Sequence, residues 1–151
     1  MDVTCGPIIF REATGADVPG ISRVRTSVIE NLLTADQLEQ RGITNASVAA
    51  SFLADAKGWV AVRDEEIVAF SIADRGSQSI FALFVLPAYE CRGIGSRLLD
   101  LALEWLWTNG AERVWLTTGA GTKAVRFYEK RGWTCTGTGP RGDLRYERER
   151  S

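Results

Sequence analysis

The feature that most constrains this chain is a short apolar run followed closely by glycines and then by an amphipathic segment. Residues 80–86 are apolar, aromatic and branched, and the run is short enough to predict a strand buried on both faces. Apolar residues recur at helical spacing from Leu98 to Leu106. Because Gly93 and Gly95 lie between the two, the sequence predicts a buried strand that turns directly into a helix.

A glycine-rich turn at the start of a helix is suited to binding phosphate. Glycines let backbone N–H groups approach a ligand without interference from a Cβ atom. The first turn of the helix adds unpaired N–H groups and the positive end of the helix dipole. The stretch therefore predicts a phosphate-containing ligand, with a turn that binds nothing as the alternative.

The spacing argues against two common phosphate sites. A nucleotide-hydrolysing P-loop needs a Lys after its last glycine, whereas Ser96 follows Gly95 here. A dinucleotide-binding turn needs a third glycine where this chain has Leu98, and it normally opens a βαβ unit rather than lying past the middle of the chain.

Composition narrows the chemistry further. The chain has 151 residues, 45% apolar and 25% charged, a composition that suits one soluble globular domain. Its formal net charge of −1 favours neither nucleic acid nor an anionic membrane as partner. With no histidine, a zinc site and a histidine base are not expected. The scattered Cys5, Cys91 and Cys135 predict reduced thiols and a cytoplasmic location. No apolar run is long enough for a membrane span, and we expect no signal peptide.

The remaining segments predict one α/β domain. Asp64 and Glu65 are expected to form a hairpin turn between two strands, and the strand after the long helix is expected to lie parallel to the central strand across a βαβ crossover. The expected order is strand 8–12, helix from 17 to about 32, a helical piece from 34, helix 47–57 stopped by Gly58, strands 58–63 and 66–73, a turn at 75–78, the central strand, the long helix, strand 113–118, helix 122–131, and strands 133–136 and 144–147.

Two motifs together resemble a known family. Residues 90–95, Glu-Cys-Arg-Gly-Ile-Gly, follow Val-Leu-Pro and resemble the acetyl-coenzyme A motif Gln/Arg-x-x-Gly-x-Gly/Ala of the GNAT superfamily of N-acetyltransferases. Glu90 departs from that motif at its first position. Downstream, Ala124, Phe127, Tyr128, Gly132 and Trp133 fit the later helix of that superfamily, Asn-x-x-Ala-x-x-Phe-Tyr followed by Gly-aromatic, with Gly121 at the Asn position.

The resemblance implies a fold and a cofactor site. It implies a single GNAT domain over residues 1–151, with a central mixed, mostly antiparallel sheet of about seven strands flanked by helices. In that fold a splayed pair of parallel strands holds the cofactor, acetyl-CoA, and freed backbone groups pair with its pantetheine arm. The cofactor-binding residues implied here are Phe84, Val85, Cys91, Arg92, Gly93, Ile94, Gly95, Ser96 and Arg97.

Tyr128 is the predicted catalytic residue. In the superfamily a Tyr at this position is often the acid that protonates the departing thiolate, and a phenol's reference pKa near 10 suits that task. The alternative is that Phe127 and Tyr128 form the apolar face of a helix. The general base is less defined: Glu30 is preferred because the first helices wall the acceptor site in relatives, with Glu66, Asp74 or a base acting through water as alternatives.

Two functions follow from these residues. The first is an N-acetyltransferase that moves an acetyl group from acetyl-CoA to a primary amine of a small molecule, or of a protein or peptide, by direct attack. The second is a non-catalytic acyl-CoA-binding sensor or interaction module with the same fold, for which Tyr128 would have no use as a proton donor. A dimer is common among relatives, so a homodimer is one possibility here, and the sequence leaves the oligomeric state open.

Overall fold

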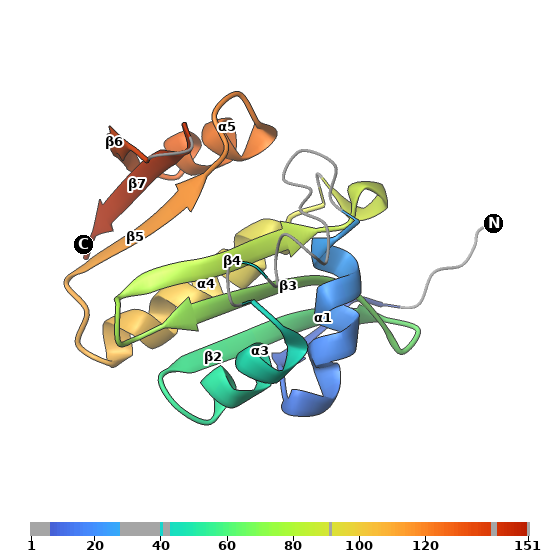
Figure 1. Ribbon diagram of the computed structural model, residues 1–151. Helices are drawn as coiled ribbons and strands as arrows, with labels where there is room; N and C mark the ends of the chain where they lie inside the picture. Colours follow the sequence, from blue (N-terminus) through green and yellow to red (C-terminus); the bar gives the residue numbers. More distant parts are fainter. Residues whose placement is uncertain (1–6, 28–39, 41–42, 91, 140–141, 151) are drawn as a thin grey trace.

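The computed structural model describes residues 7–27, 40, 43–90, 92–139 and 142–150. In this part of the chain, a first strand and two helices precede three consecutive strands, and α4, β5 and α5 precede the last two strands (Figure 1). The elements are β1 (Ile9–Glu12), the 3₁₀ turn η1 (Gly15–Asp17), α1 (Val18–Arg25), α3 (Asn45–Phe52), β2 (Ala56–Arg63), β3 (Glu66–Asp74), β4 (Ser79–Val85), η3 (Pro87–Tyr89), α4 (Ile94–Thr108), β5 (Arg113–Thr118), α5 (Lys123–Lys130), β6 (Thr134–Thr138) and β7 (Leu144–Glu149).

The described strands form one seven-stranded sheet in the order β1-β2-β3-β4-β5-β7-β6. All neighbouring strands are antiparallel except β4 and β5, which are parallel. Asp64 and Glu65 connect β2 to β3 with φ angles of 50° and 65°, as a tight hairpin turn requires. The predicted mixed, mostly antiparallel sheet and its hairpin are therefore confirmed.

Helices cover both faces of the sheet. In Figure 1, α4 lies behind the sheet, and α1 and α3 lie in front of it. The buried residues of α4 sit in one core cluster with residues of β2, β3 and β5, whereas Ile21 and Val24 of α1 pack in a second cluster with Phe70 and Ile72 of β3. Full burial of each such side chain stabilises the fold by about 1.5–3 kcal/mol. No described helix is long and apolar enough to cross a membrane.

The helix predicted from Ser47 to Lys57 is present, but its predicted end is wrong. Helix α3 ends at Phe52, and strand β2 already begins at Ala56. Gly58, expected to stop the helix, lies inside β2, where an added Cβ would come within 2.9 Å of the Phe52 ring. The glycine is needed because the end of α3 packs closely against this strand, and that contact is not visible in local sequence.

Strands β4 and β5 diverge soon after they meet. They share one residue pair, Ser79 opposite Trp115, and then separate toward their carboxyl ends (Figure 1). On its other edge, β5 pairs with β7 along its whole length. We call the region between residues 80–85 of β4 and 116–118 of β5 the strand divergence. It confirms the predicted splayed pair of parallel strands.

Candidate active site

The start of α4 has the geometry expected of a phosphate-binding turn. Gly93 is the N-cap of α4, with φ of 80°, a left-handed conformation that glycine adopts without the steric cost of a Cβ. The N–H of Arg97 donates to the carbonyl oxygen of Gly93 at 3.1 Å, which is the first hydrogen bond of the helix. The N–H groups of Ile94, Gly95 and Ser96 therefore point out of the end of the helix without helical acceptors.

Gly95 is not required by the packing of the protein. A Cβ added there would lie 3.5 Å from Cγ2 of Val85 and 3.7 Å from the ring of Phe127, which are ordinary contacts. Its φ is not among the positive values found at other glycines. Glycine inside a helix costs about 1 kcal/mol relative to alanine. The residue therefore fits a site where a ligand, rather than the chain, approaches the backbone closely.

The backbone of Val85 faces the strand divergence. Phe84 is opposite Phe70 of β3, and the N–H of Leu86 donates to the carbonyl oxygen of Val68 at 2.9 Å. Since hydrogen-bonded positions alternate along an antiparallel pair, the peptide groups of Phe84 face β3 and those of Val85 face away from it. Of the two predicted residues, Val85 thus offers free main-chain groups.

Phe84 contributes its ring to the other face of the sheet. The ring stacks on that of Phe70, with 5.6 Å between centroids, and packs with the core under α1 and α3. The side chain of Val85 packs in the core under α4. The two neighbouring residues therefore place their side chains on opposite faces beside the strand divergence.

Tyr128 is buried in a cluster of aromatic rings. Only 5% of the residue is exposed, and its ring makes edge contacts with Phe127 and Trp133 at centroid distances of 5.2 and 5.6 Å. Its hydroxyl has no hydrogen-bond partner in the described part of the chain. Burial alone raises the pKa of this phenol well above its usual value, so it keeps its proton at neutral pH.

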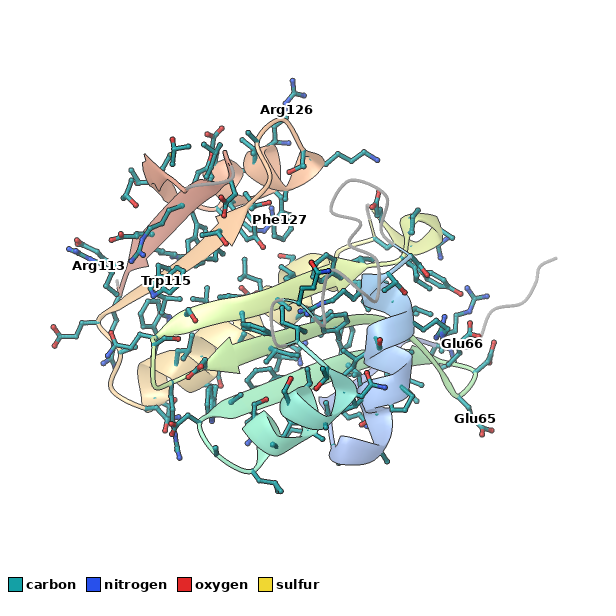
Figure 2. All side chains as sticks on the ribbon, in the orientation of Figure 1. Glu65, Glu66, Arg113, Trp115, Arg126 and Phe127 are labelled. Carbon is teal, nitrogen blue, oxygen red and sulfur yellow. The ribbon has the colours of Figure 1, made fainter. Side chains whose placement is uncertain are left out.

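Helix α5 reaches the start of α4 through two side chains. Phe127 lies on the side of α5 that faces β4 and α4, whereas Arg126 points away from the molecule (Figure 2). The guanidinium of Arg131 lies 3.9 Å from the centroid of the Phe127 ring, and its Nε donates to Oγ of Ser96 at 3.3 Å. Sequence reasoning missed Arg131, because no local pattern links it to a helix 35 positions earlier.

The charged residues before and within α4 contact different parts of the chain. Arg92 is exposed, with its guanidinium 5.4 Å from the centroid of the Tyr89 ring. Arg97 lies 5.9 Å from the Phe10 ring of β1, so its side chain points toward the far edge of the sheet. Glu90, the departure from the family motif, forms an ion pair with Lys123 of α5 at 3.1 Å.

The predicted acidic residues do not gather at one place. Glu30 and Cys91 lie outside the described residues. Glu66 is exposed at the hairpin end of β3 (Figure 2). Asp74 lies at the other end of β3, where its Oδ1 accepts hydrogen bonds from the N–H groups of Gly76 at 2.8 Å and Ser77 at 3.3 Å.

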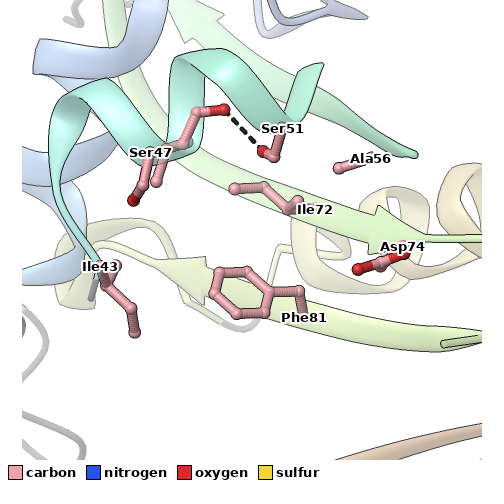
Figure 3. Close-up of a pocket in the computed structure, with 8 residues that line it drawn as sticks. Ile43, Ser47, Ser51, Ala56, Ile72, Asp74 and Phe81 are labelled. Carbon is pink, nitrogen blue, oxygen red and sulfur yellow. Dashed lines mark hydrogen bonds between the residues drawn. The ribbon is translucent and has the colours of Figure 1, made fainter. Parts of the chain in front are cut away.

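A pocket of about 210 Å³ opens between α3 and the sheet (Figure 3). Its walls combine apolar and polar side chains, with Asp74 at one end and two serines on the helix side. The lining residues are Ile43, Ser47, Val48, Ser51, Ala56, Ile72, Asp74 and Phe81. Three of these residues belong to α3, which lies on the face of the sheet opposite α4 (Figure 1).

Comparisons with known proteins agree with this architecture. Residues 26–133 match the acetyltransferase (GNAT) family. The peptidyl-lysine N-acetyltransferase YjaB of Salmonella typhimurium is 36% identical over 101 residues, covering 64% of this chain and 63% of that protein. The mycothiol acetyltransferase of Corynebacterium glutamicum is 40% identical over 74 residues, covering 46% of this chain and 25% of that protein. This chain thus spans less than two thirds of either relative.

Solved structures with the same fold are also found. The PaiA N-acetyltransferase of Thermoplasma acidophilum, solved in complex with coenzyme A, has a TM-score of 0.82 at 16% identity, over 95% of this chain and 99% of that one. The ribosomal-protein-S18-alanine N-acetyltransferase of Escherichia coli has a TM-score of 0.73 at 15% identity, over 95% and 94%. At these identities the likeness establishes the fold.

Proposed function

Because this chain belongs to the acetyltransferase (GNAT) family, we propose that it moves an acetyl group from acetyl-CoA to a primary amine by direct attack. One observation carries the proposal. The helix start at Gly93–Ser96 has unpaired N–H groups and a glycine that packing does not require, and it lies against Val85, where β4 faces the strand divergence. That combination fits a ligand with a pyrophosphate and an extended arm.

The residues divide the work of binding. The N–H groups of Ile94, Gly95 and Ser96 hold the pyrophosphate, and the left-handed Gly93 orients them. The free peptide groups of Val85 pair with the pantetheine arm as a neighbouring strand would. Cys91 contributes its N–H and Arg92 adds positive charge, as the family resemblance implies. The resemblance implies the same role for Arg97, although its guanidinium lies near the Phe10 ring of β1.

Tyr128 supplies the proton in the transfer step. The neutral amine nitrogen forms a bond to the thioester carbonyl carbon, the carbon–sulfur bond breaks, and the sulfur leaves with the bonding electrons. The Tyr128 hydroxyl, which has no hydrogen-bond partner among the described residues, gives its proton to that sulfur. The proton lost by the amine goes to a base, for which Glu30 is the proposed residue. Tyr128 then recovers its proton from solvent.

The donor's chemistry is simple, since acetyl-CoA supplies the acetyl group as an activated thioester. The acceptor is proposed to be an amine of a small molecule or of a peptide. A homodimer and a single domain over residues 1–151 remain predictions from the family resemblance.

The test is thiol release from acetyl-CoA across a panel of amines. We expect turnover with at least one amine and none when the protein is omitted. Acetyl-CoA binding by calorimetry, with no turnover for any amine, would contradict the enzyme and favour the non-catalytic sensor.

A further inference from the structure

Arg25 is a charged residue in an unusual position. It stands at the last position of α1, and only 7% of it is exposed. Its guanidinium carbon lies 5.4 Å from the ring centroids of both Phe81 and Phe84, and 5.7 Å from that of Phe70. Three rings thus surround one cation on the face of the sheet that α1 and α3 cover.

This cation has no anionic partner among the described residues. Within the described ranges, no ion pair or hydrogen bond involves its guanidinium, and its Nε is fully enclosed without an acceptor. Burial lowers the pKa of Arg25 to about 10, which still leaves it charged at neutral pH. Aromatic contacts offset only part of the cost of burying a charge. A buried guanidinium is normally retained where an anion completes its hydrogen bonds.

A neighbouring residue shows what a structural arginine looks like in the same helix. Arg23 donates from Nη2 to the carbonyl oxygen of Ile67 at 2.7 Å, and it is exposed otherwise. Arg23 therefore has a protein acceptor and stays largely in water. Arg25, in contrast, has no acceptor among the described residues and is removed from water. The contrast indicates that Arg25 serves something other than the attachment of α1 to the sheet.

The position of Arg25 connects the pocket to the strand divergence. The residue lines a small hollow that shares Ile43, Val48 and Ile72 with the pocket of about 210 Å³. On the other side it touches Phe84, whose neighbour Val85 faces the strand divergence. Arg25 therefore lies between the pocket and the part of β4 beside the strand divergence.

We propose that Arg25 binds a carboxylate of the acceptor, so that the substrate is an amine that also carries a carboxylate, with its apolar part in the adjoining pocket. This inference rests on the proposed acetyl transfer. A guanidinium matches a carboxylate through two parallel hydrogen bonds, and the low exposure of Arg25 strengthens them. Asp74, at the far end of the pocket, already accepts two backbone hydrogen bonds, so Arg25 is the group that fixes the acceptor's charge.

The first experiment compares matched acceptors. L-amino acids with apolar side chains and their carboxamides are offered to the wild-type protein with acetyl-CoA, and kcat/KM is measured for each pair. We expect the acids to be preferred about 10- to 100-fold, the range that charge-assisted hydrogen bonds produce. Arg25→Met should abolish the preference, Arg25→Lys should retain part of it, and the matched control Arg23→Met should retain all of it.

The second experiment needs no acetyl-CoA. Thermal unfolding is followed with N-acetyl-L-leucine or N-acetyl-L-phenylalanine, each against its carboxamide. The carboxylates should raise Tm of the wild type and of Arg23→Met, but not of Arg25→Met. Without ligand, Arg25→Met should unfold at the same or a higher temperature, because it removes a buried charge and keeps an apolar side chain of similar length.

The outcomes separate the two proposals. If acids and amides are acetylated equally, or if Arg25→Met keeps the preference while its Tm falls, Arg25 is structural and the inference is overturned. If no amine is acetylated, acetyl transfer is contradicted, and the Tm shifts still decide whether Arg25 binds carboxylates. A wild type that shows neither a preference nor a carboxylate-specific Tm shift also overturns the inference.

Discussion

The two faces of the sheet differ in how they would recognise a ligand. On the α4 side, the candidate groups are main-chain N–H groups, positioned by Gly93 and left accessible by Gly95. On the α1 and α3 side, the candidate group is a side chain, Arg25, set among aromatic rings. Recognition through the backbone needs glycines at fixed spacing, whereas recognition through side chains needs only single residues. The first kind therefore leaves a sequence motif and the second does not.

Burial acts on both faces with different results. It raises the pKa of Tyr128, which keeps that phenol neutral, and it lowers the pKa of Arg25 to about 10, which leaves that guanidinium charged. Removal from water disfavours the charged form in both cases. Tyr128 therefore stays protonated at neutral pH, whereas Arg25 stays positively charged and can bind an anion.

The largest expected effect is at Tyr128. Tyr128→Phe keeps the ring and removes the proton, so kcat should fall about 10²- to 10⁴-fold, or roughly 3–5 kcal/mol of barrier. Coenzyme A affinity, measured by calorimetry, should not change. The control is Tyr146→Phe, in the same aromatic cluster. It removes a hydroxyl that donates to Oε2 of Glu129 at 2.9 Å. A fall in kcat under about threefold for Tyr128→Phe would assign the proton to water or the amine.

Substitution of Gly95 by alanine should raise the stability of the fold and lower the affinity for coenzyme A. Gly95→Ala should stabilise the fold by up to about 1 kcal/mol, since the Cβ makes ordinary contacts within a helix. Both Gly95→Ala and Gly95→Val should weaken coenzyme A binding, the valine by more than about tenfold, or 1.4 kcal/mol. Gly137→Val, at a β6 position with open space around it, is the control. Unchanged affinity in a folded Gly95→Val protein would remove the proposed phosphate site.

Alkaline unfolding should report the burial of Tyr128. Its folded pKa is raised, so its contribution to stability is complete below the unfolded pKa near 10 and is lost as pH rises above that value. Each such group changes the free energy of unfolding by up to about 1.4 kcal/mol per pH unit in that range. Denaturant unfolding at pH 9 to 11 should show a shallower decline for Tyr128→Phe than for the wild type. Parallel declines would mean that the hydroxyl is solvated.

The smallest expected effect is at Arg92, on the exposed rim of the α4 face. Arg92→Ala should weaken coenzyme A binding by about threefold or less, and less still at high salt, because an exposed charge is screened. Arg126→Ala, which removes an outward-pointing arginine of α5, should have no effect. A fall of more than about tenfold in the coenzyme A affinity of Arg92→Ala would show that side chains, and not only backbone N–H groups, bind the phosphates.

Features set by neighbouring residues could be predicted from the sequence. The central strand, the glycine turn into α4 and the hairpin at Asp64 depend on residues close together in the chain, and all three are confirmed. Features set by distant contacts could not. Gly58 appears as a helix stop until the Phe52 ring is seen against it.

Two arginines at the candidate site were missed for the same reason. Arg25 falls among the apolar residues of α1, and only the three rings from β3 and β4 reveal that its charge is buried. Arg131 comes after the family motif, and its contact with Ser96 depends on how α5 packs against α4. An arginine at an apolar helix position was the one signal that the sequence offered.

The strand divergence also has a consequence for the solubility of the protein. Beyond Ser79 and Trp115, the facing sides of β4 and β5 are two strand edges in the interior of a sheet, without a partner strand among the described residues. Unpaired edges are templates for association with another chain, and proteins usually protect them. An occupant of this position would cover both edges at once. In the proposed binding mode, the acetyl donor would cover these edges as a neighbouring strand does, and its removal should increase self-association of the chain.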